Sequence, residues 1–195
     1  MTELLPPTPS QTVGPFYGYA LPFTGGGEIA PAGRPDAITV HGHVYDGAGA
    51  PVPDALIEIW QAGPSGSTTG APGSLRRDPV TGRDAGRDGV RFTGFGRVAT
   101  DADGHWAVRT LVPGPHADGA APYLAVVVFA RGLLHHLHTR IYLSEHAAGA
   151  AADPALADLP AERLATLCAR HEHDRVHRFD IRLQGEDETV FLDFR

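Results

Sequence analysis

The sequence predicts a mainly β fold, an antiparallel or mixed β-sandwich of about eight strands with one short helix. Two observations support this prediction. The 195-residue chain contains 24 Gly and 17 Pro, an excess that is typical of many short strands joined by turns. Apolar and polar residues also alternate along several segments, with turn residues between them. The length suits one domain with a sizeable core.

The strands can be taken in order along the chain. Residues 38–45 alternate Ile, Val, Gly and Val with Thr, His, His and Tyr, which is the pattern of a half-buried strand. Residues 123–130 contain an unbroken Val-Val-Val-Phe run, which predicts a fully buried central strand. The sequence DADG at 101–104 predicts a hairpin turn. Further strands are expected at 55–61, 95–100, 105–111, 133–143, 177–183 and 189–194.

Three segments depart from the strand pattern. Residues 1–35 form a Pro- and Gly-rich arm with three clustered aromatic residues, so we expect this arm to pack on a partner chain and residues 36–195 to form the sandwich. Residues 63–94 show almost no apolar periodicity, which predicts a long loop that is functional or mobile. The sequence DLPAE at 158–162 predicts the start of the helix, with Cys168 on its apolar face.

The composition excludes several kinds of chemistry. The chain has no Lys, which rules out a Schiff-base lysine and a P-loop lysine. Cys168 is the only cysteine, so the chain has no internal disulfide and no Cys-rich metal site, and we expect this thiol to behave as a small hydrophobic side chain. A formal net charge of −7 without a basic cluster argues against nucleic-acid binding. Neither a membrane-spanning stretch nor a signal peptide is visible, so the cytoplasm is expected.

Histidines and one arginine are candidate functional side chains. On a strand, His136 and His138 would point to one face and His135 to the other, so the first two could ligate a metal or simply form a polar strand face. Arg131 directly follows the predicted central strand, which would hold its head group at the edge of the sheet. There it could bind an anionic ligand or pair with a nearby Asp or Glu, and the residues alone leave both interpretations open.

Several motifs, spread in order from residue 3 to residue 194, are shared with one known family. They are ELLP (3–6), TPSQTVGPF (8–16), WQ (60–61), GFGR (94–97), FARG (129–132), HLHTR (136–140), FDIRLQGE (179–186) and ETVF (188–191). In this combination the chain resembles the intradiol ring-cleavage dioxygenases, and among them the alpha chains, which lack iron. The resemblance implies a β-sandwich core. It also implies that the catalytic chains of the family hold a non-haem ferric ion with two Tyr and two His.

The positions that match those four ligands carry other residues here. By resemblance they fall at Thr68, His116, Tyr123 and Ala125, so at most His116 and Tyr123 could ligate, in exchanged positions. Two protein ligands are too few for a tight site. We therefore expect this chain to bind no metal and to contribute no catalytic residue. The resemblance then implies a heteromer in which a homologous beta chain carries Fe(III).

The role expected by resemblance is to line the substrate pocket of that beta chain. Thr12, Gly14, Pro15 and Phe16 of the arm would form one wall, with Phe16 replacing the Tyr that is usual in the family. Arg131 matches an arginine that faces the substrate, and a fixed guanidinium would favour 3,4-dihydroxybenzoate (protocatechuate) over plain catechol. The expected reaction is protocatechuate plus O₂ giving 3-carboxy-cis,cis-muconate.

Two alternative functions remain open at this point. The chain could be a self-sufficient, homo-oligomeric intradiol dioxygenase with unusual ligands such as His136 and His138. It could instead be a binding module on the same sandwich, with no chemistry of its own. Iron and ring cleavage in the lone chain would favour the first alternative, and a lack of activity even with a partner chain would favour the second. The aromatic arm favours the presence of a partner.

Overall fold

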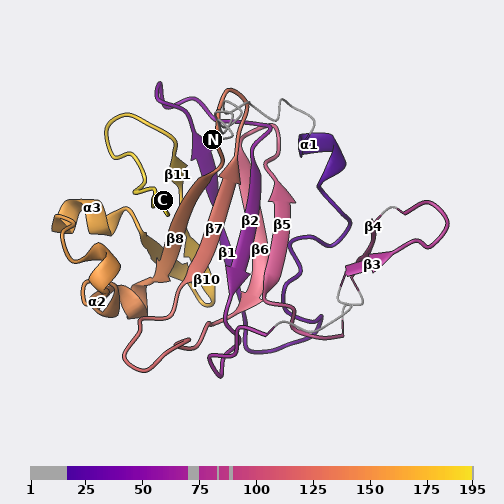
Figure 1. Ribbon diagram of the computed structural model, residues 1–195, viewed down its shortest axis with the longest axis horizontal. Helices are drawn as coiled ribbons and strands as arrows, with labels where there is room; N and C mark the ends of the chain where they lie inside the picture. The colour runs from indigo at the N-terminus through magenta and orange to yellow at the C-terminus, as the bar shows by residue number, and fades with distance from the viewer. Residues whose placement is uncertain (1–16, 70–74, 83, 88–89, 195) are drawn as a thin grey trace, which may run out of the picture.

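A computed structural model describes residues 17–69, 75–82, 84–87 and 90–194 (Figure 1). Strands dominate these residues, which confirms the mainly β prediction. The strands are β1 (Ala37–Tyr45), β2 (Leu56–Gln61), β3 (Leu75–Arg77), β4 (Asp84–Arg87), β5 (Phe95–Ala99), β6 (His105–Leu111), β7 (Leu124–Phe129), β8 (Leu137–Leu143), β9 (Cys168–His173), β10 (Val176–Arg178) and β11 (Ile181–Arg182). The helical segments are short: α1 (Tyr17–Ala20), η2 (Ser144–His146), α2 (Ala147–Ala150), η3 (Pro154–Leu156) and α3 (Ala161–Ala165).

The main sheet is mixed and folds over on itself. Its strands follow the order β11-β1-β10-β9-β8-β7-β2-β5, and β6 pairs with β1. The pairs β1–β10, β1–β11 and β8–β9 are parallel, whereas β1–β6, β2–β5, β2–β7 and β7–β8 are antiparallel. Figure 1 shows β8, β7, β2 and β5 in front of β1, β6 and β10. Val40 of β1, Trp106 of β6 and Val126 of β7 share one buried cluster between these two layers, as the predicted sandwich requires.

Two strands test the predicted burial patterns. In β1 the alternation is confirmed, because Val40, Gly42 and Val44 are buried while His41 and His43 between them are half-buried. The prediction of a fully buried strand is wrong for β7. This strand alternates as well: Val126 and Val128 face the core, whereas Ala125 lies on a half-buried outer face. An unbroken run of β-branched residues fits a strand with one dry face as well as a strand with two.

Several predicted element boundaries need correction. The predicted helix is only five residues long, and Cys168 is not on it: Cys168 begins β9 and pairs in parallel with Tyr142 of β8. The predicted last strand makes a single bridge, between Leu192 and His138. The segment at 63–94 contains the β3–β4 hairpin, a local pairing that needs no apolar face. For Cys168, hydrogen bonding to a distant segment outweighs the local helical pattern.

The first described residues pack against the sandwich. Tyr17 in α1 is buried, with its ring centroid 6.2 Å from that of Phe129 at the end of β7. Ile29, which belongs to the predicted arm, is fully buried in the main core cluster. Residues 1–16 lie outside the described residues, so the packing of the arm on a partner chain stays a prediction. No helix in the described part of the chain is long and apolar enough to cross a membrane.

Candidate functional site

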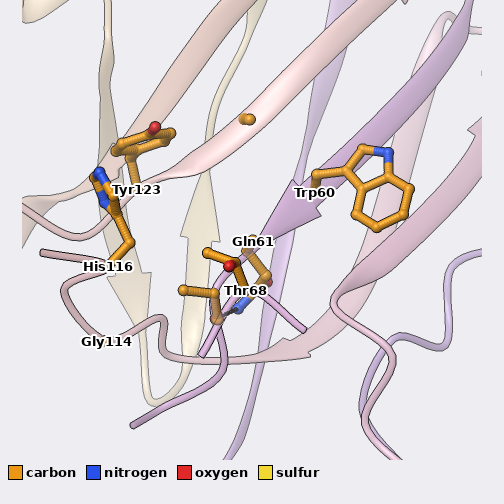
Figure 2. Close-up of a pocket in the computed structure, with 8 residues that line it drawn as sticks. Trp60, Gln61, Thr68, Gly114, His116 and Tyr123 are labelled. Carbon is orange, nitrogen blue, oxygen red and sulfur yellow. Dashed lines mark hydrogen bonds between the residues drawn. The ribbon is translucent and has the colours of Figure 1, made fainter. Parts of the chain in front are cut away.

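Four positions that the sequence singled out line a single cavity of about 170 Å³. Thr68, His116, Tyr123 and Ala125 come from three separate segments and meet there (Figure 2). The other lining residues are Trp60, Gln61, Ala62 and Gly114. Figure 2 shows His116 and Tyr123 side by side, with Thr68 and Gln61 across from them and the Trp60 ring directed away. We call this cavity the aromatic pocket.

Close backbone contact between two loops builds one wall of the aromatic pocket. The amide of Gly114 donates to the carbonyl oxygen of Gly63 at 3.0 Å, which ties the loop after β2 to the loop after β6. Gly66 has a positive φ of 83°, and a Cβ at this position would lie 2.1 Å from the carbonyl oxygen of Pro115. Only glycine permits both this conformation and this approach. The Gly-rich sequence of this loop therefore serves to place Thr68 opposite His116.

A buried polar network holds the other wall. Arg140 of β8 lies directly across from Ala125 in the antiparallel β7–β8 register, and its guanidinium carbon is 4.3 Å from the centroid of the Tyr123 ring. Its Nη1 donates to Asp153 Oδ2 at 2.6 Å and to the Tyr142 hydroxyl at 3.1 Å. Burial raises the pKa of Tyr142 to about 12, so its hydroxyl stays protonated. Asp153 and Tyr142 hold Arg140, and the cation–π contact between Arg140 and the Tyr123 ring in turn holds Tyr123 in place.

These residues do not fit a ferric ion. His116 and Tyr123 could each supply one donor atom, but their rings meet edge to face with centroids 5.5 Å apart. Ala125 has no donor atom, and the neutral hydroxyl of Thr68 is a poor substitute for a tyrosinate. The guanidinium of Arg140, 4.3 Å from the Tyr123 ring centroid, is paired with Asp153 and supplies no donor to a metal. The donor set is too small for a ferric ion.

The second candidate site, His136 and His138, forms an aromatic cluster. Their rings meet edge to face with centroids 4.8 Å apart, and His138 makes a similar contact with Phe194 at 5.2 Å. Burial, followed by the charge of His136, lowers the pKa of His138, which favours its neutral form. Residues 135–138 and 191–194 line a cavity of about 650 Å³. Within the described ranges, no group of three or more His, Cys, Asp or Glu side chains is arranged to hold a metal ion.

Arg131 forms the ion pair that one of its two interpretations predicted, and its binding of an anionic ligand stays a prediction. It follows β7 by two residues, and its Nε donates to Asp54 Oδ2 at 2.6 Å. Its side chain is nevertheless 68% exposed, so the guanidinium remains open to a ligand. The buried Tyr17 lies close enough to this ion pair for both charges to act on its hydroxyl. Burial raises the pKa of Tyr17 to about 12, with a further contribution from the charge of Asp54.

Two groups of predicted site residues have different outcomes. Thr12, Gly14, Pro15 and Phe16 lie outside the described residues, so their role stays a prediction. Sequence reasoning missed Asp54, Tyr17 and Arg140, because their roles depend on which strands are neighbours. The signal available for Asp54 was its place just before the strand at 55–61, which would have pointed to Arg131 only if the β2–β7 pairing had been known.

Comparisons with known proteins agree with this geometry. A family model described as "Dioxygenase" matches residues 28–185. The alpha chain of protocatechuate 3,4-dioxygenase from Burkholderia cepacia is 41% identical over 202 residues, covering 95% of this chain and 96% of that protein. The beta chain of the same enzyme from Burkholderia cepacia is 29% identical, covering 79% of this chain and 67% of that protein.

A solved structure with low sequence identity to this chain shares its fold. The dioxygenase domain of a carbohydrate-binding fusion protein from Streptomyces sp. SirexAA-E superposes with a TM-score of 0.58 at 23% identity, covering 82% of this chain and 87% of that one. This likeness concerns the fold alone. Together with the family match and the near-full-length identity to an alpha chain, it confirms the resemblance that the motifs indicated. The chain belongs to the intradiol ring-cleavage dioxygenase family, and within it resembles protocatechuate 3,4-dioxygenase alpha chains over nearly its full length.

Proposed function

We propose that this chain is the iron-free alpha subunit of a heteromeric protocatechuate 3,4-dioxygenase. The observation that carries the proposal is the aromatic pocket, where two of the four positions matching the family's iron ligands are Thr68 and Ala125. A chain that keeps the fold but has lost the donors needs a partner that has them. A homologous beta chain supplies Fe(III), and both oxygen atoms of O₂ enter the product 3-carboxy-cis,cis-muconate.

The contribution of this chain is to bind and orient the substrate. Protocatechuate differs from catechol by a ring carboxylate, which is negatively charged at neutral pH. Arg131 presents an exposed guanidinium at the end of β7, and a guanidinium binds a carboxylate through two parallel hydrogen bonds when the geometry allows. An arginine anchored at a strand end therefore selects the carboxylated ring. It also fixes the rotation of this ring in the substrate pocket that the beta chain carries.

The arm is proposed to close the same substrate pocket of the beta chain. Thr12, Gly14, Pro15 and Phe16 would line it, with Phe16 providing an aromatic wall that has no hydroxyl. Support comes from Tyr17, the next residue along the chain, which packs against Phe129 at the end of the strand that precedes Arg131. Tyr17 and Arg131 thus both lie near the end of β7, and residues 12–16 directly precede Tyr17 in the chain.

Co-expression tests the proposal. The chain is produced alone and together with an iron-bearing beta chain, and each preparation is assayed for loss of protocatechuate absorbance and for iron. We expect ring cleavage only from the co-expressed pair. Ring cleavage by the lone chain would instead support a self-sufficient enzyme. A beta chain that is equally active without this chain and does not co-purify with it would support a binding module.

A further inference from the structure

Arg131 contacts Asp54 through only one edge of its guanidinium. Nε donates to Asp54 Oδ2 at 2.6 Å, and Nη2 contacts the same carboxylate oxygen. The described residues provide no other hydrogen-bond or ion-pair partner for this guanidinium. Arginine has five N–H donors in a planar fork, so the end that carries Nη1 still offers donors to a second carboxylate.

The strand pairing explains why these two side chains meet. Leu56, the first residue of β2, lies opposite Phe129, the last residue of β7. Asp54 precedes this pair by two residues and Arg131 follows it by two, so both emerge at the same end of one antiparallel ladder. Asp54 is the more enclosed partner, with its side chain 26% exposed against 68% for Arg131. The carboxylate is thus the fixed member and the guanidinium the adjustable one.

Tyr17 closes the protein side of the pair. Only 4% of this residue is exposed, and its buried hydroxyl has no hydrogen-bond partner among the described residues. Its ring packs against Phe129. The Arg131 side chain is 68% exposed, so a ligand would reach the guanidinium from the solvent side.

An exposed ion pair contributes little to folding stability, so stability does not explain this arrangement. Orientation does explain it. An unpaired arginine head samples many rotamers, and binding a ligand would require these to be frozen. We propose that Asp54 is a positioning residue that holds the Nη1 end of Arg131 toward the ring carboxylate of the substrate. This inference rests on the proposed function, in which Arg131 faces the substrate.

A purely electrostatic role and a positioning role for Asp54 predict opposite changes in the KM for protocatechuate. Removing its negative charge leaves Arg131 more attractive to an anion, so a purely electrostatic role predicts a lower KM for protocatechuate in Asp54→Asn and Asp54→Ala. Positioning predicts a higher KM, because the guanidinium loses its fixed direction. The sign of the change in KM therefore decides between the two.

The experiment uses the co-expressed heteromer carrying Asp54→Ala, Asp54→Asn or Asp54→Glu. For Asp54→Ala we expect KM for protocatechuate to rise about fivefold with kcat nearly unchanged. The inhibition constant of catechol, which has no carboxylate, should not change. Anaerobic calorimetry should show the dissociation constant for protocatechuate rising by the same factor, and Asp54→Glu should restore part of the affinity.

The control variant is Asp36→Asn. Asp36 accepts from the same two nitrogens, Nε and Nη2, of Arg34 in an exposed pair, and we expect no change in KM there. An unchanged or lower KM in both Asp54→Ala and Asp54→Asn would overturn the inference. If the wild-type heteromer is active and Arg131→Ala is impaired while the Asp54 variants are not, only this inference fails. If the wild-type heteromer is inactive, the proposed function itself fails.

Discussion

Arg140 stacks on Tyr123, with the guanidinium carbon 4.3 Å from the ring centroid. This contact lies at the aromatic pocket, where Arg140 is the cross-strand neighbour of Ala125. An intradiol site needs anionic ligands around a cation, whereas this pocket has an alanine beside an arginine. At the positions that match the family's iron ligands, the chain thus has a pocket with few donor atoms beside a salt-bridged network.

Removing the arginine from this network should destabilise the protein. Arg140→Met leaves Asp153 partly buried without its ion-pair partner, and we expect the free energy of unfolding to fall by about 1–3 kcal/mol. Urea denaturation of the lone chain measures this. The control is Arg170→Met, which removes a 71% exposed arginine from Glu172, a carboxylate that keeps His41 as a second partner, and should cost less than about 1 kcal/mol. Equal losses in the two variants would contradict a structural role for the Arg140 network.

The Gly66 turn should be intolerant of any side chain. Gly66→Ala combines a positive φ with a Cβ that would lie 2.1 Å from a backbone oxygen, so we expect a loss of about 2–4 kcal/mol. Gly49→Ala is the control, because Gly49 has a similar φ of 79° but open space around a Cβ. That variant should lose only about 1 kcal/mol. Thermal unfolding compares the two, and a Gly66→Ala loss no larger than the Gly49→Ala loss would show that the loop can relax.

Mild acid should weaken the fold through buried histidines. Burial lowers the pKa of His177 below its usual 6.5, and its Nδ1 has no hydrogen-bond partner in the described part of the chain. The unfolded chain therefore binds a proton at a higher pH than the folded chain does. The stabilising contribution is complete above pH 6.5 and decreases as the pH falls from 6.5 through the lower pKa of the folded state.

Urea midpoints measured from about pH 7.5 down to about pH 5 test this pH dependence. We expect the midpoint to fall with pH, and His177→Gln to reduce the slope. His105 and His138, whose pKa values are also lowered first by burial, should account for part of the remaining slope. A midpoint that rises toward pH 5, or a slope identical in His177→Gln, would show that His177 is not held neutral by the fold.

Arg131 should control substrate affinity without affecting iron. In the co-expressed heteromer, Arg131→Ala is expected to raise KM for protocatechuate by about tenfold or more, because a charged hydrogen-bonded pair is lost. Arg131→Lys should be intermediate, since an ammonium cannot form the two parallel bonds. Iron content should equal that of the wild type. Arg34→Ala, at another exposed Arg–Asp pair, is the control. Unchanged steady-state kinetics in Arg131→Ala would show that Arg131 does not contact the substrate.

The sandwich could be predicted from the sequence because its signals are local. The alternation in β1 and the turn at 101–104 each depend on a few consecutive residues, and both are found in the structure. The predicted hairpin is wrong, because β5 pairs with β2 and β6 pairs with β1, so the turn connects two layers instead of two paired strands. The resemblance also located the aromatic pocket, since Thr68, His116, Tyr123 and Ala125 do line one cavity. These predictions did not need the order of the strands.

The remaining features depend on which distant segments become neighbours. Asp54 meets Arg131 only because β2 pairs with β7 in one register, and no local pattern specifies that register. Cys168 joins a strand because β8 offers it a parallel partner. His177, in a sequence that is rich in charge, is buried because β10 lies between β1 and β9. Long-range pairing therefore sets the details of the site.

The iron content of the separated chains tests the central claim most directly. The lone chain is incubated with ferric iron, desalted, and analysed for bound metal and for the visible absorption that a tyrosinate–iron site produces. We predict negligible iron and no such band, while the co-expressed heteromer holds about one ferric ion per pair of chains, because two donors are too few for a tight site. About one iron per chain in the lone protein, with the visible band present, would contradict the account.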